Sequence, residues 1–201
     1  MATALHESWT HKLARALVRP LVPTAVTPNH LTTARLVTGL AACVAFAVGP
    51  GAAQWWAGGF WLLSAFLDRA DGELARLSGK TSPGGHVYDY ATDVVINSLV
   101  FIAIGFGLSG EAWGRLPLLL SLIAGIAIGG ASILSEYLER SGKVDGKAYE
   151  GNAGFDFDDI LYVLTPIAWL NWTWPLVIGA AIGGPYFLFI TWRRLRAAGN
   201  S

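Results

Sequence analysis

The sequence predicts an all-α integral membrane protein, with a bundle of six transmembrane helices preceded by an amphipathic helix on the membrane surface. Of its 201 residues, 53% are hydrophobic and only 14% are charged, and the mean hydropathy is +0.46. Apolar stretches of about 20 residues, the length that crosses a bilayer as a helix, recur with short polar interruptions. Because these stretches use nearly the whole chain, we expect a single membrane domain, 1–201, and no separate soluble domain.

The first predicted element is a surface helix over 8–23. Its apolar residues and its cations fall on separate helical faces: Trp9, Leu13 and Leu17 on one, Lys12, Arg15 and Arg19 on the other. This pattern is typical of a helix that lies flat in the membrane interface. We therefore expect no cleavable signal peptide ahead of the first span.

Six transmembrane helices are expected within 31–192. We place them at 31–48, 55–77, 87–108, 116–138, 155–170 and 175–192. The fifth differs from the others, because Pro166 interrupts it and its N-terminal end is acidic. Gly125-x-x-x-Gly129 and Gly179-x-x-x-Gly183 lie in the fourth and sixth spans, where missing side chains let helices approach closely. We interpret both motifs as packing positions, one of which could serve a homodimer.

The cations predict an orientation in the membrane. An even number of spans places both termini on one side, and the cations gather there: Lys12, Arg15, Arg19, Arg35, Arg69, Arg76, Lys80, Arg140, Lys143, Lys147, Arg193, Arg194 and Arg196. Arg115 is on the opposite side. By the positive-inside rule, the termini should be cytoplasmic, and we expect the cytoplasmic membrane of a bacterium or archaeon. The formal net charge is zero, and nucleic acid is not expected among the partners.

One polar stretch, 66–93, interrupts the apolar sequence. It contains four aspartates together with Arg69, Arg76 and Lys80. An aspartate at the centre of a span costs about 2.5–3.5 kcal/mol, so four would cost roughly 10–14 kcal/mol at that depth. The two arginines cannot neutralise four carboxylates, whereas a divalent cation can.

The spacing of the aspartates supports a metal site. Asp68 and Asp71 are three residues apart and Asp89 and Asp93 four apart, so each pair lies on one helical face. The segment 78–85 is a turn by composition, which makes the second and third spans an antiparallel hairpin with both pairs at its cytoplasmic end. All-carboxylate sites select Mg²⁺, Mn²⁺ or Ca²⁺, and the single cysteine excludes a multi-cysteine metal site. Because Mg²⁺ shares its remaining positions with phosphates, we expect a phosphorylated ligand.

The other residues of the stretch suit such a ligand. Gly72 and Ala75 remove bulk on the metal-facing side of the second span, and Arg76 offers a planar fork to phosphate oxygens. Gly85, one helical turn before Asp89, would let the backbone come close at the hairpin. Tight helix packing or a surface charge is the alternative interpretation of each.

Together these residues form the motif Asp68-x2-Asp71-Gly72-x2-Ala75-Arg76-x8-Gly85-x3-Asp89-x3-Asp93. It resembles, without departure, the signature of the CDP-alcohol phosphatidyltransferase family. The segment Thr27 to Thr32, "TPNHLT", and the expected six-span bundle with its preceding amphipathic helix are also similar to members of that family. Members cleave the pyrophosphate of a CDP-linked donor, pass the phosphoryl-bearing half to a hydroxyl acceptor and release CMP.

The resemblance implies a role for each signature residue. Asp68, Asp71 and Asp89 would bind a pair of Mg²⁺ or Mn²⁺ ions, with Asp93 completing the metal site and acting as the general base. The donor would be held by the remaining four: Gly72, Ala75, Arg76 and Gly85. The donor is expected to be CDP-diacylglycerol, which makes the reaction a step of phospholipid biosynthesis. The alternative is a soluble CDP-alcohol that passes its headgroup to a lipid hydroxyl.

The acceptor lies outside the signature, and two groups of residues bear on it. Arg140 and Lys143 could receive an anionic alcohol, or they could be ordinary positive-inside residues. Asp156, Asp158 and Asp159 could contact polyol hydroxyls or an amine, or they could cap the fifth span. The sequence does not select the alcohol, the acyl chains or the oligomeric state.

Two other classes of protein place acidic residues near a membrane. An intramembrane prenyltransferase also binds diphosphate through aspartates and magnesium, but it would not need the spacing of Gly72, Ala75, Arg76 and Gly85. A divalent-cation transporter should distribute its acidic residues along a pathway, whereas here they collect at one end of two spans.

Overall fold

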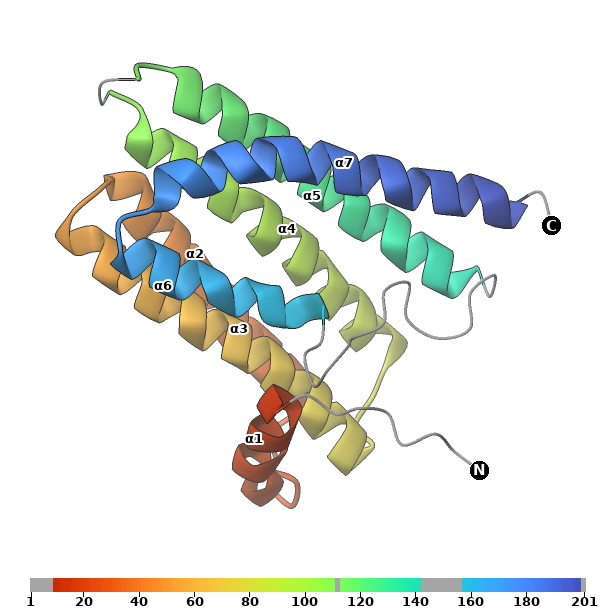
Figure 1. Cartoon of the computed structure of the whole chain (residues 1–201). Helices are drawn as coiled ribbons and strands as arrows, with labels where there is room; N and C mark the ends of the chain where they lie inside the picture. The colour runs from red at the N-terminus through yellow and green to blue at the C-terminus, as the bar shows by residue number, and fades with distance from the viewer. Residues whose placement is uncertain (1–8, 111–112, 142–156, 200–201) are drawn as a thin grey trace.

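The protein is described by a computed structural model, which defines residues 9–110, 113–141 and 157–199. This part of the chain is helical and contains no strand, which confirms the predicted all-α class. Its elements are α1 (Trp9–Val18), η1 (Arg19–Leu21), α2 (Pro28–Val48), α3 (Ala52–Ser78), α4 (Pro83–Leu108), α5 (Leu116–Arg140), η2 (Phe157–Val163), α6 (Leu164–Trp169) and α7 (Thr173–Gly199). They form one bundle of long helices, with α1 against one end (Figure 1).

Among the described residues, four helices are long and apolar enough to cross a membrane: α2, α4, α5 and α7. Helix α3 has 27 residues, but its C-terminal half carries the charged residues of the acidic stretch. The expected fifth span is occupied by η2 and α6, whose apolar part, Asp159–Trp169, is too short to cross a bilayer of about 30 Å by itself. The number of six crossings therefore stays a prediction.

The core of the bundle is built from helices α2 to α7. Helix α2 packs against α3 and α4, α5 packs against α4 and α7, and α6 lies on α3 (Figure 1). Phe46 of α2, Trp61 of α3 and Ile104 of α4 belong to one buried cluster, which α6 and α7 complete with Ala168 and Val177. Helices joined by short connections therefore lie antiparallel, and their ends gather at two ends of the bundle.

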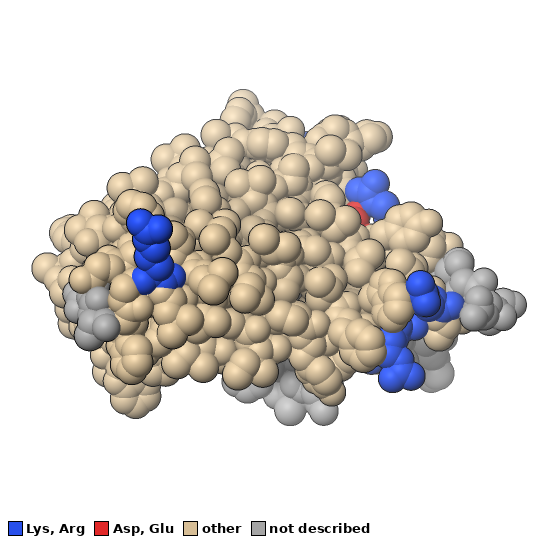
Figure 2. All heavy atoms as spheres, turned by 90° about the horizontal axis from the view of Figure 1, so that it is seen from above, with Lys and Arg blue, Asp and Glu red and all other residues tan. Residues whose placement is uncertain are grey.

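The two ends of the bundle differ in chemistry. The connections α2–α3, α4–α5 and α6–α7 meet at the left end in Figure 1, where Trp55 stacks on Trp169 and Trp113 lies against Trp174. The α3–α4 turn and the C-terminal ends of α5 and α7 lie at the right end. Figure 2 shows that the face seen from above carries charged side chains only toward its two ends. An uncharged band between charged ends is typical of the surface that a membrane protein presents to lipid.

Helix α1 packs across the C-terminal half of α3. It buries Thr10, Ala14 and Val18 and exposes Trp9 and Leu13. Two separate faces are what the sequence predicts for an amphipathic helix, and its position in the membrane interface stays a prediction.

The loop after α1 is fixed to the hairpin by Lys80. The Lys80 ammonium donates to the carbonyl oxygens of Val22, Thr24 and Val26 at 3.3, 2.6 and 3.2 Å. This contact holds the start of α2 beside the end of α3.

The two GxxxG motifs have different environments. A Cβ placed on Gly125 would lie 2.7 Å from the backbone oxygen of Ser98 on α4, so this glycine allows α4 and α5 to touch. The predicted packing role of the first motif is confirmed at this position. A Cβ on Gly179 or Gly183 would meet no described atom within 4 Å, so these glycines face open space.

We expect Gly125→Ala to lower the free energy of unfolding by about 1–3 kcal/mol, because the new methyl group meets a backbone carbonyl that cannot move aside. Gly59→Ala on α3 is the matched control, since a Cβ there meets nothing within 4 Å. That control should leave stability unchanged or raise it by up to about 1 kcal/mol through helix propensity. Thermal unfolding in detergent measures both, and equal midpoints for the two variants would contradict this account of the α4–α5 contact.

Candidate active site

The acidic residues of α3 and α4 meet at the right end of the bundle. Helix α3 ends at Ser78, followed by Gly79 with φ of +65°, and Ser82 caps α4 by accepting the Gly85 N–H at 3.0 Å. This short antiparallel turn brings the two helices back side by side. Three of the aspartates, Asp68, Asp71 and Asp89, each offer a carboxylate oxygen within 4.8 Å of the others. The predicted opposition of the two carboxylate pairs is therefore present in the structure.

A buried arginine of α2 lies among these carboxylates. Arg35 is 2% exposed, and its Nη1 lies 2.7 Å from Asp68 and 3.3 Å from Asp89. Its Nη2 pairs with Asp93, which belongs to the same α4 face as Asp89. Thr32, one turn earlier on α2, donates to Asp71 Oδ2 at 2.8 Å. Helix α2 therefore supplies both a counter-ion and a hydrogen-bond donor to the acidic residues.

This finding corrects one part of the sequence analysis, which counted Arg35 among the positive-inside cations. Arg35 is instead buried inside the bundle, as is Arg69. The sequence contains a signal for it: an arginine inside an apolar span costs about 2.5–3.5 kcal/mol unless a partner compensates. Because Thr32 and Arg35 are three residues apart, they share a helical face, and that face is turned toward the aspartates.

The donor set fits a hard divalent cation. All three grouped ligands are carboxylates, and no soft sulfur or imidazole donor belongs to the group. Asp71 is almost completely buried, whereas Asp68 and Asp89 are partly open to solvent, so an ion bound there could also reach a second ligand. Oxygen-only sites of this kind suit Mg²⁺, Mn²⁺ or Ca²⁺.

Two cavities flank the carboxylates. The larger, which we call the polar cavity, has a volume of about 490 Å³ and extends from α3 and α4 toward α5 and α7. The smaller, which we call the glycine pocket, has about 280 Å³ and lies between the start of α2 and the α3–α4 turn. Five residues line both: Asp71, Gly72, Arg76, His86 and Asp89. The acidic residues therefore stand at the boundary between two spaces that a two-substrate reaction could use.

The small residues of the signature shape the glycine pocket. The atoms nearest to a Cβ on Gly72 belong to the Arg76 side chain, the first at 3.5 Å, so Gly72 leaves room for a ligand beside the acids. Ala75 lines the same pocket. A Cβ on Gly85 would lie 2.8 Å from Asn29 Oδ1, so Gly85 allows α4 to approach the start of α2. Gly85 thus contributes through close packing as well as through its place in the pocket wall.

An apolar groove continues from the polar cavity toward the middle of the bundle. It has a volume of about 550 Å³ and is walled mainly by α4, η2, α6 and α7. The two spaces share Asn97, Ser132, Leu161 and Phe187. Gly179 and Gly183 of the second GxxxG motif line the groove, which explains why they face open space. A ligand with a polar head and apolar chains could occupy both spaces at once.

The residues expected to bind the acceptor are not brought together. Arg140 pairs with Glu136 and is not among the residues that line the polar cavity. Asp159 is buried, accepts from Thr10 and Arg69, and does not line that cavity either. Lys143, Asp156 and the side chain of Asp158 lie outside the described residues. Polar side chains that sequence reasoning did not assign to the site line the cavity instead: His11, Arg69, His86, Tyr90, Asn97, Ser132 and Ser135.

Comparison with solved structures finds the same fold in an enzyme. The phosphatidylinositol phosphate synthase PgsA1 of Mycobacterium tuberculosis, whose crystal structure contains bound CDP-DAG, superposes with a TM-score of 0.60. The match covers 92% of this chain and 94% of that chain, with 22% sequence identity. At this identity the likeness establishes the fold. No curated protein sequence matches this chain.

The family is established by sequence. Residues 25–189 match the family model described as CDP-alcohol phosphatidyltransferase, a segment that begins before α2, ends within α7 and contains the whole acidic signature. Enzymes of this family are membrane-bound transferases of phospholipid biosynthesis. With four membrane-capable helices and a family match over most of its length, this chain is a multi-pass membrane protein and belongs to the CDP-alcohol phosphatidyltransferase family.

Proposed function

We propose that the protein transfers the phosphatidyl group of CDP-diacylglycerol to the hydroxyl group of a polar alcohol and releases CMP. One observation supports this assignment above the others: the signature carboxylates lie between the glycine pocket and the polar cavity, and the polar cavity continues into an apolar groove. A nucleotide, a reacting phosphate and two acyl chains need such a sequence of environments. The CDP-DAG in the solved relative supports the choice of donor.

The donor would be divided among the three spaces. The cytidine half would occupy the glycine pocket, where Gly72 and Ala75 leave room beside α3. Arg76 lines both this pocket and the polar cavity, so its guanidinium group could bind the diphosphate between them. The acyl chains would follow the apolar groove past Gly179 and Gly183, whose missing side chains keep that wall open.

A divalent metal is expected in this family, and the carboxylates of Asp68, Asp71 and Asp89 suit it. We propose a pair of Mg²⁺ or Mn²⁺ ions at these residues, with Asp93 as a fourth acidic partner. When bound, the ions would neutralise the diphosphate and stabilise the charge that develops on the departing CMP. Positioning and charge neutralisation should then provide most of the rate acceleration.

We propose Asp93 as the general base. It lines the polar cavity, and its side chain is 35% exposed, so an alcohol in that cavity could reach it. Asp93 would take the proton of the acceptor hydroxyl while that oxygen forms a bond to the phosphorus of the phosphatidyl group. The bond between this phosphorus and the bridging oxygen would break, and CMP would leave with the bridging oxygen. The cytoplasmic placement of this end of the bundle follows from the positive-inside rule and is part of the proposal.

The activity can be tested with purified protein in detergent. We expect incubation with CDP-diacylglycerol, Mg²⁺ and a panel of alcohols to give CMP and one phospholipid, identified by its mass. EDTA should abolish the reaction, and added Mg²⁺ or Mn²⁺ should restore it. Product from a CDP-alcohol and diacylglycerol, with none from CDP-diacylglycerol, would instead establish that the donor carries the headgroup and that the lipid is the acceptor.

Two outcomes would reject the proposal in favour of other classes of protein. Release of pyrophosphate from a prenyl diphosphate, with no release of CMP from either kind of CDP donor, would indicate a prenyltransferase. Flux of Mg²⁺ into liposomes without any nucleotide would indicate a transporter.

A further inference from the structure

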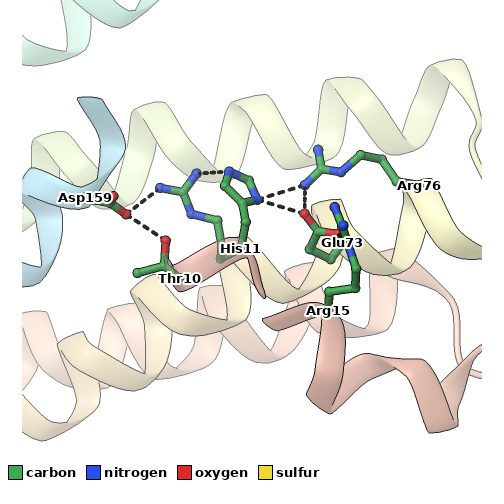
Figure 3. A network of polar contacts seen from close by, with 7 residues as sticks. Thr10, His11, Arg15, Glu73, Arg76 and Asp159 are labelled. Carbon is green, nitrogen blue, oxygen red and sulfur yellow. Dashed lines mark hydrogen bonds and ion pairs between the residues drawn. The ribbon is translucent and has the colours of Figure 1, made fainter. Parts of the chain in front are cut away.

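Helix α1 lies before residues 25–189, the segment that matches the family, yet it contributes directly to the active site. His11 lines the polar cavity beside the signature residues. Thr10, His11 and Arg15 all turn toward α3 and η2, where they meet Asp159, Glu73 and Arg76 (Figure 3). A helix that only anchored the chain to the membrane would not need three polar contacts on this side.

Glu73 is the centre of these contacts. Its side chain is only 1% exposed, although it sits on α3 between Asp71 and Arg76. Its Oε1 lies 2.8 Å from His11 Nδ1 and 2.7 Å from Arg76 Nη2, and its Oε2 lies 2.9 Å from Arg15 Nε. Two of its three partners therefore come from α1, and the third is the arginine of the signature.

A second branch of the network holds the other side of His11. Arg69 Nη1 lies 3.0 Å from His11 Nε2, and Arg69 Nη2 donates to Asp159 Oδ1 at 3.1 Å. His11 Nδ1 lies 2.8 Å from Glu73 Oε1 and 3.3 Å from Arg76 Nη2. His11 therefore contacts Glu73 and Arg76 through one ring nitrogen and Arg69 through the other.

Arg76 is held at one edge only. Its Nη2 donates to Glu73 at 2.7 Å and lies 3.3 Å from His11 Nδ1, while neither Nη1 nor Nε has a protein partner among the described residues. The side chain is 55% exposed and lines both the glycine pocket and the polar cavity. The free edge of the guanidinium group is therefore available to a ligand at the boundary between the two spaces.

The contacts from α1 explain why this edge stays free. A carboxylate with two unoccupied oxygens pairs with arginine through two parallel hydrogen bonds, which use both terminal nitrogens. Arg15 occupies Glu73 Oε2, and His11 shares Oε1. Glu73 consequently binds Arg76 through a single nitrogen and orients it without taking up the rest of its donors.

We propose that α1 is a positioning element of the active site, in which Arg15 acts through Glu73, and His11 acts through Glu73 and by direct contact, to orient Arg76 toward the phosphates of the nucleotide donor. The inference rests on the proposed function, because it takes a CDP-linked molecule as the ligand of Arg76. His11, Arg15 and Glu73 are positioning residues, and Arg76 is the residue that contacts the ligand.

The test is a double-mutant cycle on nucleotide affinity. Calorimetry with CDP and Mg²⁺ should show binding weakened about tenfold in His11→Ala, consistent with the loss of a hydrogen bond to a charged group. The same substitution in an Arg76→Ala background should have no further effect, because residues that act through one contact are not additive. His11→Gln should restore affinity, since its amide can donate to Glu73. In turnover, His11→Ala should raise the KM for the CDP donor and leave the KM for the alcohol unchanged.

Two further variants serve as a second test and as a negative control. Arg15→Ala should weaken CDP binding in the same way and provides the answer if His11→Ala does not fold. Lys12→Ala removes a positive charge from the exposed side of the same helix and should bind CDP as the unaltered protein does.

The outcomes separate this inference from the proposed function. Equal loss in both backgrounds, or a lowered melting temperature with unchanged CDP affinity, would overturn the positioning role alone. Failure of the unaltered protein to bind CDP would overturn the donor assignment and the inference with it.

Discussion

Replacing Asp93 with Asn should stop the release of CMP while leaving the CDP donor bound. Asparagine keeps the shape of the side chain and an oxygen that Arg35 can contact, but it cannot take the proton of the acceptor hydroxyl. Loss of a general base lowers turnover by about 10²–10⁴-fold. CMP release under saturating CDP-diacylglycerol and Mg²⁺ measures this effect, and calorimetry with CDP measures whether the donor site is intact.

A control on the same helix separates chemistry from folding. Val95 lies two residues beyond Asp93 and is exposed, so Val95→Ala should retain full turnover. If Asp93→Asn turned over at a rate comparable with that of the Val95 variant, another group would have to be the base. If Asp93→Asn lost CDP binding together with turnover, its main role would be in the metal and donor site.

The acidic hairpin could be predicted from the sequence because it depends on residue spacing and turn composition within one continuous segment. Asp68 and Asp71 are spaced by one helical turn, and so are Asp89 and Asp93. The segment 78–85 between the two pairs consists of turn-forming residues, so both pairs must lie at the same end of the helical hairpin. The first four spans were likewise placed within a few residues of α2, α3, α4 and α5, since length and hydropathy are properties of continuous segments. Neither prediction required knowledge of contacts between residues that are distant in the sequence.

The partners of the acidic residues could not be predicted, because they depend on which helix faces which. Arg35 looks like any cation near the basic end of a predicted span until α2 is packed beside both α3 and α4. Glu73 lies inside the signature segment, but two of its three partners are on α1, about 60 residues earlier. The same limit applies to Asp159, which seemed available to an acceptor and instead pairs with Arg69 and Thr10.

The fifth expected span departs from the simple pattern for a physical reason. Pro166 lacks a backbone N–H, and the residues before it form a 3-10 helix, Phe157–Val163, rather than a regular α-helix. The segment lies on α3, where Trp61 donates to the Leu161 carbonyl at 2.7 Å. Its residues Ile160, Leu161 and Ile167 line the apolar groove, and a membrane crossing at this segment stays a prediction.

Arg35→Met should produce the largest loss of stability among the substitutions considered. The variant keeps an unbranched apolar side chain and removes a cation that contacts Asp68, Asp89 and Asp93 together. Removing one partner of a buried ion pair costs about 3–5 kcal/mol, because the remaining charges are left uncompensated. We therefore expect a marked fall in the melting temperature when the variant is unfolded in detergent with EDTA.

Magnesium should restore part of that loss. A divalent cation at Asp68, Asp71 and Asp89 supplies the positive charge that the missing guanidinium group provided, and any ligand that binds only the folded state stabilises it. The rise in melting temperature on adding Mg²⁺ should be larger in Arg35→Met than in the unaltered protein, because Arg35 no longer competes for the same carboxylates. Arg115→Met, at the opposite end of the bundle, is the matched control and should melt as the unaltered protein does in both buffers. If Mg²⁺ raised all three melting temperatures equally, the carboxylates that contact Arg35 would not be the ones that bind the metal.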